Sequence, residues 1–258
     1  KNAIGNHQYT AYKFAGDTDS VNIGTAAQWD ATIGDNTGAD STEKMSFSAW
    51  INKTADGGGN LGRIFDFGQS DIFLYSTGTE ELAFSSRLNN AHAEWRTGPS
   101  SFGLNQWVHV AVTYDASDTL NNDPVIYVNG QRVASSHLGS SQAKHATYSG
   151  IATEAGYIGN RHTHDRAFNG EITEVAIWNS LLSDSEVFAI YFATRNHSAS
   201  SLKEVAINLS KAINNDSTIW EQEPLQNLTK DGKVSAFKHD GFYQPMDTIN
   251  EKNYLEKQ

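Results

Sequence analysis

Cysteine is absent from the 258 residues, and proline is scarce, with only 4 residues. Without cysteine the chain forms no disulfides and no thiolate metal sites. So few prolines, with 21 glycines, argue against a collagen-like or low-complexity disordered chain. No apolar run approaches the roughly 20 residues of a spanning helix, so no membrane span is expected. No leader peptide is evident, although the first residue is Lys1.

Positive charge is also in short supply. Lysine and arginine total 19 against 30 acidic residues, for a formal net charge of −11. A nucleic-acid partner is not expected, because neutralising phosphates requires a basic face. The acidity is interpreted as a contribution to solubility, with a few carboxylates available for a divalent cation. Hydrophobic residues make up 38% of the chain, enough for a core in one large β domain or two small ones.

Short β-strands dominate the pattern from residue 9 to about residue 180. The segments are rich in Val, Ile, Tyr, Phe and Trp, and Gly, Asn, Asp and Ser separate them. This spacing predicts an all-β, antiparallel two-sheet sandwich or jelly roll, with no helix longer than a few turns before Ser183. The predicted strands are Tyr9–Phe14, Ser20–Ile23, Met45–Asn52, Arg63–Phe67, Ile72–Ser76, Glu81–Ser85, Ala93–Thr97, Trp107–Tyr114, Val125–Val128, Arg132–Ser135, Ala155–Ile158 and Glu171–Trp178.

The strongest local signal is the hairpin-like segment from Gln106 to Val133. Both faces of its first strand, Trp107–Tyr114, are largely apolar, so we expect this strand to be covered on both sides. Further on, Asn129-Gly130 predicts a tight hairpin turn, because a type I′ turn needs positive φ at both central residues.

A helix is predicted to close this part of the chain. Ser183 and Glu186 have the spacing of a capping box, which predicts a helix from Asp184 to about Thr194. Its buried stripe would comprise Val187, Ile190, Tyr191 and Thr194. Residues 196–201 then have the composition of a linker. We place a boundary near residue 197, between a domain of residues 1–196 and an appendage of residues 197–258.

Six segments follow one another in the order of a known family. They are Phe14–Ile23, Met45–Ile51, Trp107–Val133, Ala155–Asn160, Phe168–Trp178 and Leu182–Val187. On these segments, residues 9–195 resemble the laminin-G-like, concanavalin A-like lectin/glucanase jelly-roll domains. The resemblance implies a sandwich of two antiparallel sheets and a role in glycan binding, protein adhesion or spacing, because one fold serves several functions.

The tail carries a second resemblance. The runs Trp220–Leu225 and His239–Thr248 make residues 205–258 similar to the C-terminal fragment of glucose-1-phosphate cytidylyltransferases. That resemblance implies a sugar contact for Glu223 and a Mg²⁺ contact for Asp247. However, no glycine-rich phosphate-binding loop follows a strand anywhere in the chain, so phosphoryl transfer is not expected. We interpret the tail as a captured fragment reused for folding or docking.

A calcium site is implied by the first resemblance. Many domains of that fold bind calcium where the turn after the first strand meets the last long strand. Here Asp17, Asp19 and Glu174 would be the carboxylate ligands, since Ca²⁺ takes 6–8 oxygens from flexible acidic turns. Thr173 stands where the family often has aspartate. The alternative is that Asp17 and Asp19 cap a β-turn.

Trp95, Arg96 and His92 form a candidate sugar platform on an outer sheet face. Sugars stack their C–H faces on aromatic rings, and neighbouring polar groups bind the hydroxyls. The alternative for Trp95 is packing in the core, which is the commoner environment of a strand tryptophan.

A polar loop, residues 160–166, is a second candidate. It contains Arg161, His162 and His164, which could contact a sugar. The two histidines with Asp165 could instead bind a transition metal, since neutral imidazole is a common ligand. The third alternative is a simple exposed loop.

Glycoside hydrolysis is not expected. A retaining enzyme needs two carboxyl groups about 5–5.5 Å apart. Glu171 and Glu174 are separated by an odd number of positions, so they face opposite sides of a regular strand.

The sequence therefore predicts a non-enzymatic carbohydrate-binding or adhesion module of a surface-exposed protein. Such a module would lie outside the cell or on a virion and bind a glycan or protein partner. The alternative is a structural or decoration protein of a phage virion or cell-surface assembly. In that case other subunits would be its partners and residues 197–258 its anchor.

Overall fold

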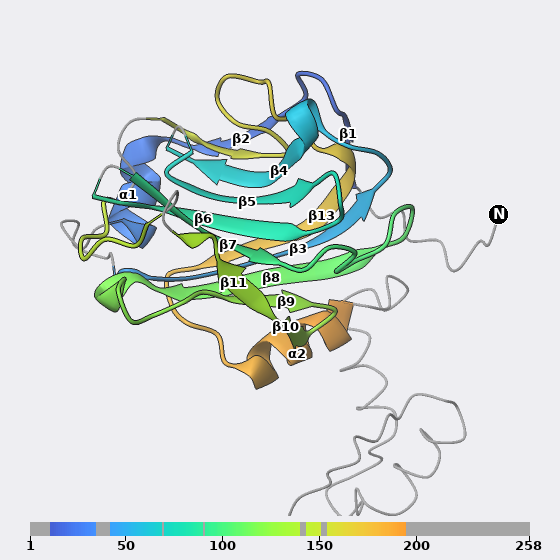
Figure 1. Ribbon diagram of the computed structural model, residues 1–258. Helices are drawn as coiled ribbons and strands as arrows, with labels where there is room; N and C mark the ends of the chain where they lie inside the picture. The colour runs from blue at the N-terminus through green and yellow to red at the C-terminus, as the bar shows by residue number, and fades with distance from the viewer. Residues whose placement is uncertain are drawn as a thin grey trace, which may run out of the picture. The chain divides into compact units, whose positions relative to one another are not determined.

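The computed structural model describes residues 11–34, 42–68, 70–89, 91–139, 143–150 and 154–194. Over these ranges the chain forms two stacked antiparallel sheets (Figure 1). The predicted all-β jelly-roll sandwich is confirmed. No helix in these ranges is long and apolar enough to span a membrane.

Each sheet combines strands that are distant in the sequence. The six-stranded sheet has, in spatial order, β1 (Tyr12–Ala15), β13 (Asn169–Trp178), β3 (Lys44–Lys53), β8 (Val108–Asp115), β9 (Val125–Val128) and β10 (Gln131–Val133). The seven-stranded sheet has β11 (Ser135–His137), β7 (Ala91–Thr97), β6 (Leu82–Leu88), β5 (Ile72–Thr77), β4 (Leu61–Phe67), β12 (Gly156–Ile158) and β2 (Val21–Gly24). The helices are α1 (Ala26–Ile33), α2 (Asp184–Thr194) and the 3₁₀ turns η1 (Gly58–Asn60) and η2 (Ala116–Asp118).

The core lies between the two sheets, because alternate residues of each central strand point inward. Val110 and Val112 of β8 are fully buried, as is Phe84 of β6. Phe47 of β3 stacks on Phe65 of β4 with ring centroids 4.3 Å apart. These contacts hold the two sheets face to face.

The predicted hairpin turn joins β9 to β10. Asn129 has φ of 49° and Gly130 has φ of 75°, which confirms the positive φ that a two-residue turn of this kind requires. The side chain of Asn129 also accepts a hydrogen bond from the backbone N–H of His109, at 3.0 Å. The turn is therefore tied to β8 as well as to its own two strands.

The predicted helix and its capping box are also confirmed. Ser183 Oγ accepts from the N–H of Glu186 at 3.3 Å, and the Glu186 carboxylate accepts from the N–H of Ser183 at 2.7 Å. Helix α2 lies beside β9 and β10, on the outside of the six-stranded sheet (Figure 1). Its Tyr191 stacks against Trp50, whose indole Nε1 donates to Thr194 Oγ1 at 2.8 Å. Strand β8 is thus covered on both faces, as its sequence predicted.

Several local features were not predicted. Helix α1 begins after Thr25, whose backbone N–H donates to Gln28 Oε1 at 2.9 Å. The segment predicted as one strand, Arg132–Ser135, contributes to β10 and β11, which belong to different sheets. A β-bulge interrupts β13, and within it Glu174 has φ of 51°. The assumption that this strand is regular is therefore wrong.

The tail was assigned from its sequence alone. The chain divides into two units, residues 1–200 and 201–258. Glu223 and Asp247 lie outside the described residues. Their implied roles, and the boundary placed near residue 197, stay predictions.

Candidate functional site

The outer face of the seven-stranded sheet carries part of the predicted ligand site. Alternate side chains of β7 point to opposite sides, so His92 and Arg96 lie on the outer face. Trp95 points into the core, where it is 1% exposed, and its Nε1 donates to Asp123 Oδ1 at 2.6 Å. The interpretation of Trp95 as an exposed platform is wrong and the alternative, packing in the core, is confirmed, because odd and even positions of a regular strand cannot share a face.

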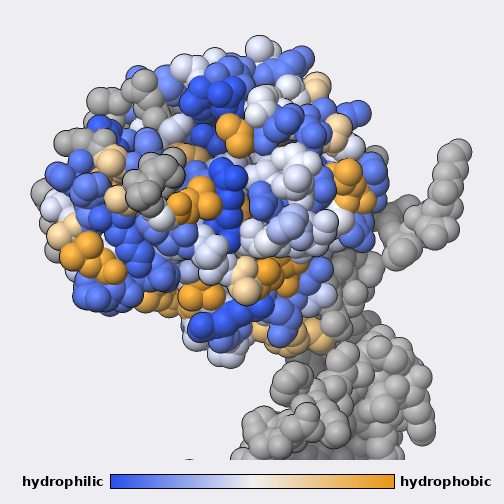
Figure 2. Space-filling model, viewed as in Figure 1, coloured by the Kyte–Doolittle hydropathy of each residue, from blue (hydrophilic) through white to orange (hydrophobic). Residues whose placement is uncertain are grey.

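Neighbouring strands add further groups in register with Arg96. Strand pairing aligns Arg63 with Tyr75, Tyr75 with Ala83, and Ala83 with Arg96. We call the resulting surface the polar face. It comprises Arg63, Asp66, Phe73, Tyr75, Arg87, His92, Glu94 and Arg96. In the view of Figure 2 the domain shows mostly hydrophilic side chains, with small separate hydrophobic patches.

Sequence reasoning did not identify Tyr75, Phe73 or Glu94 as site residues. The signal for the two aromatic residues was present in β5, whose run Ile72–Tyr75 is apolar at both odd and even positions. Such a run predicts packing on both faces of the strand. Glu94 shares a strand face with Arg96, two residues away, but its second partner, Tyr75, comes from β5, so that contact became visible only in the folded sheet.

The Arg96 side chain is held in place by hydrogen bonds to two residues of the polar face, Glu94 and Tyr75. Its Nε donates to Glu94 Oε1 at 2.7 Å, and its Nη2 donates to the Tyr75 hydroxyl at 2.9 Å. The Tyr75 hydroxyl in turn donates to Glu94 Oε1 at 2.7 Å. Burial opposes the charge of Arg96, but the hydrogen bonds that Arg96 donates to Glu94 and Tyr75 outweigh burial and raise the guanidinium pKa. Burial, with the adjacent Glu94 carboxylate, raises the pKa of Tyr75, which keeps its hydroxyl protonated.

Arg96 also borders a pocket of about 410 Å³ at the edge of the sheet. We call it the Arg96 pocket. It is lined by Glu81, Arg96, Thr97, Gly98, Ala134, Ser135, Ser136 and Leu138. The Arg96 side chain is 32% exposed, so it is fixed on one side and accessible on the other. Glu81 stands 4.0 Å from Arg96 Nη1 and accepts from Thr77 Oγ1 at 3.0 Å.

The opposite end of the polar face is filled by a buried ion pair. Arg63 Nε donates to Asp66 Oδ2 at 2.9 Å, and Ser70 supplies a backbone and a hydroxyl hydrogen bond to the same carboxylate. The Arg63 guanidinium lies 3.8 Å from the centroid of the Phe73 ring. Burial lowers the pKa of Arg63 and raises that of Asp66. This end of the face is packed and supports the sheet.

His92 lies on β7, four residues before Arg96, and is paired with Arg87 of β6. Its ring is 5.9 Å from that of Phe73, and the neighbouring Arg87 pairs with Asp71 at 2.7 Å. Burial lowers the pKa of His92, so the ring is neutral near pH 7. It is placed on the same face as Arg96 but does not line the Arg96 pocket.

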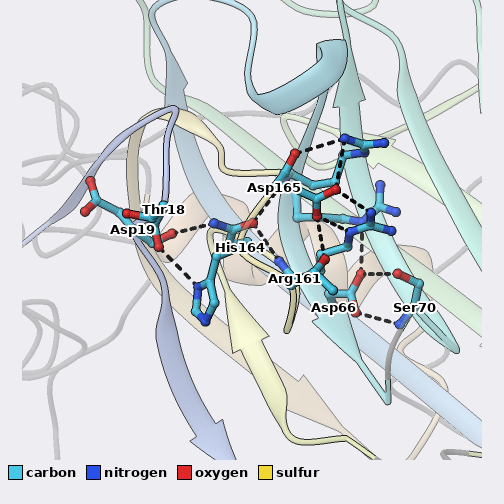
Figure 3. A network of polar contacts seen from close by, with 11 residues as sticks. Thr18, Asp19, Asp66, Ser70, Arg161, His164 and Asp165 are labelled. Atoms are coloured by element: carbon cyan, nitrogen blue, oxygen red, sulfur yellow. Dashed lines mark hydrogen bonds and ion pairs between the residues drawn. The ribbon is translucent and has the colours of Figure 1, made fainter.

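The loop at residues 160–166 is braced internally and against the turn after β1. Arg161 donates two hydrogen bonds of 2.6 Å to Asp165. The His164 Nδ1 lies 3.2 Å from Ser20 Oγ and 3.2 Å from the carbonyl oxygen of Thr18. Figure 3 shows these side chains between the Thr18–Asp19 turn and Asp66. The backbone N–H of Arg63 donates to the carbonyl oxygen of Arg166 at 2.9 Å, so the loop adjoins the packed end of the polar face.

The structure does not bring together the ligands of either predicted metal site. Asp19 accepts from the N–H of Ala15 at 2.9 Å and Asp17 from the N–H of Thr18 at 2.5 Å, as turn-capping carboxylates do. Because Ala15 pairs with Asn169, Glu174 lies five residues further along β13, or ~17 Å away. Within the ranges described, no three His, Asp or Glu side chains gather to hold a metal ion. These residues do not fit the calcium site that the resemblance implied, nor a site at His162 and His164.

Comparison with known proteins identifies relatives of both parts of the chain. A profile described as the concanavalin A-like lectin/glucanases superfamily matches residues 24–188, more than half of the chain. The glucose-1-phosphate cytidylyltransferase of Salmonella typhimurium is 59% identical over 44 residues, which is 17% of each protein. This chain therefore covers less than a fifth of that enzyme.

Solved structures share the fold at low sequence identity. A Trypanosoma rangeli sialidase in complex with 2,3-difluorosialic acid matches 77% of this chain and 30% of its own, with 16% identity and a TM-score of 0.51. The CBM40 of the Ruminococcus gnavus IT-sialidase, bound to alpha2,3 sialyllactose, matches 70% of this chain and 98% of its own, with 13% identity and a TM-score of 0.47. At these identities the similarity concerns the fold alone.

Proposed function

Since the chain belongs to the concanavalin A-like lectin/glucanases superfamily, we propose that its jelly-roll domain is a non-enzymatic carbohydrate-binding module. The ligand would occupy the Arg96 pocket. The observation that supports this proposal is the accessible Arg96 guanidinium, held by Glu94 and Tyr75 at the edge of a pocket of about 410 Å³.

The preorganised arginine suits a ligand rich in hydroxyl groups. Two of its nitrogen atoms are already bonded within the protein, so the side chain loses little freedom when the ligand binds. Ser135 and Ser136 add hydroxyl groups that donate and accept, and Leu138 adds an apolar contact. Pockets that combine a few placed polar groups with apolar lining are typical of small-ligand sites.

The carboxylates at this site favour binding over catalysis. Glu94 accepts hydrogen bonds from both Arg96 and Tyr75, and Glu81 accepts from Thr77. Both acids therefore already take part in holding the site together, whereas glycoside hydrolysis requires one acid and one nucleophile or base free to react.

A role at a surface follows from the same proposal. A glycan-binding module of this kind would act outside the cell or on a particle, with a glycan as its partner. The alternative, a structural component of a virion or cell-surface assembly anchored by the tail, is tested separately. Deletion of residues 197–258 should then release the protein from its particle, and retained incorporation, assayed by immunoblot of purified particles, would count against that alternative.

The Arg96→Ala variant tests the site. We expect binding of the glycan identified on an array to weaken by about 10- to 100-fold in calorimetry, because a hydrogen bond to a charged group is lost. Arg132→Ala is the matched control, since Arg132 lies on β10 of the other sheet with a 60% exposed side chain. Unchanged affinity in Arg96→Ala, or no binding to any glycan on the array, would contradict the proposal.

A further inference from the structure

The Arg96 pocket contains a donor and an acceptor set just too far apart to bond to each other. Arg96 Nη1 and Glu81 Oε2 are 4.0 Å apart, beyond hydrogen-bond distance. The other two nitrogen atoms of Arg96 are occupied by Glu94 and Tyr75, so Nη1 is the one directed toward Glu81. Glu81 Oε2 accepts one hydrogen bond, from Thr77, and a carboxylate oxygen has room for a second.

A single hydroxyl group fits between these two atoms. A hydroxyl oxygen accepts from a guanidinium at about 2.9 Å and donates to a carboxylate at about 2.7 Å. With those two distances, a separation of 4.0 Å corresponds to an angle at the hydroxyl oxygen of about 90°. A carboxylate ligand offers only acceptors, so it would pair with Arg96 and leave Glu81 facing a like charge.

The charge balance of the pocket points the same way. The lining contains one cation, Arg96, and one anion, Glu81, and the carboxylate of Glu94 lies directly behind the cation. An acidic sugar would bring a third negative charge to a site where Glu81 and Glu94 already balance the single positive charge of Arg96. The geometry points to an uncharged, hydroxyl-rich pyranose as the ligand, with one hydroxyl bridging Arg96 and Glu81. This inference rests on the proposed carbohydrate-binding function.

An array of matched neutral and acidic probes tests the ligand class. The array would hold neutral glycans beside their carboxylated counterparts, such as lactose with sialyllactose and methyl-esterified with free polygalacturonate. We expect the wild-type protein to prefer the neutral member of its best pair by about 10-fold or more, because the acidic member faces Glu81.

The Glu81→Gln variant tests the bridge itself. Glutamine keeps the acceptor toward Thr77 but removes the negative charge, so the fold should be retained. We expect the affinity for the neutral glycan to fall by about 10-fold and the discrimination against the acidic counterpart to shrink. Glu174→Gln, the same change on β13 of the other sheet, should alter neither quantity.

The possible outcomes distinguish a failure of the neutral-sugar inference from a failure of the proposed carbohydrate-binding function. If the wild-type protein prefers the acidic member of a pair and Arg96→Ala abolishes that binding, the function stands and the neutral ligand is wrong. If neutral glycans bind but Glu81→Gln changes nothing, the bridging hydroxyl is wrong. If no probe binds, both the function and the inference are overturned.

Discussion

Replacing Asp66 with alanine is expected to lower the free energy of unfolding by about 3–5 kcal/mol, because it leaves a buried arginine without its counter-ion. Arg63 and Asp66 are each at most 4% exposed and bond at 2.9 Å. The substitution also removes the acceptor of the two Ser70 hydrogen bonds. Urea denaturation followed by intrinsic fluorescence measures the loss.

The control for this variant is Asp165→Ala. Asp165 pairs with Arg161 at 2.6 Å, but its side chain is 47% exposed, so solvent screens the pair. We expect a loss of at most about 1 kcal/mol there. Equal effects for the two substitutions would show that burial of the Arg63–Asp66 pair does not govern its contribution to stability.

Because Arg63 lies on the Phe73 ring, Asp66→Ala should also weaken glycan binding by loosening the polar face.

Lowering the pH from 7 to 4 is expected to cost the domain about 3 kcal/mol of stability through His109 alone. His109 is 1% exposed, and its ring contacts those of Trp50 and, on α2, Tyr191. Burial lowers the pKa of His109 to about 4, from 6.5 in the unfolded chain. Between these two values the unfolded state binds more protons than the folded state. Stability is therefore complete above about pH 6.5 and is lost as the pH falls toward 4.

The His109→Phe and His109→Asn variants isolate this contribution. Neither replacement titrates, so the slope of unfolding free energy against pH between 6.5 and 4 should flatten by the amount that His109 supplies. Two variants are needed because a change of size between Trp50 and Tyr191 alters stability at every pH, whereas only the slope reports the proton. An identical slope in the wild type and both variants would refute the assignment.

Local patterns predicted the framework of this domain well. The turn at Asn129-Gly130 and the capping box at Ser183 and Glu186 depend on backbone geometry and hydrogen bonds within a few residues. The strands follow from apolar residues at short, regular spacing. Helix α1 was missed because it is only eight residues long and lies between strand-like segments. The bulge at Glu174 was missed because a glutamate, unlike a glycine or an asparagine, does not signal a positive φ.

The residues of the candidate site were predicted less completely than the framework. Arg96 and His92 were identified correctly as residues of an outer sheet face, but Trp95 was grouped with them against the two-residue period of a strand. Tyr75 and Glu81 were not identified at all. Each becomes a partner of Arg96 only because β5, β6 and β7 align in register.

By itself, the sequence determined the fold class, the hairpin turn and the closing helix, because each depends on periodicity or on contacts between near neighbours in the chain. Only the tertiary structure decided which side chains surround Arg96, which ones cap a turn, and how far Glu174 lies from Asp17. Those facts depend on strand order and register, which bring residues together across long stretches of sequence. No short segment of the sequence specifies these pairings, because they depend on the free energy of packing both complete sheets together.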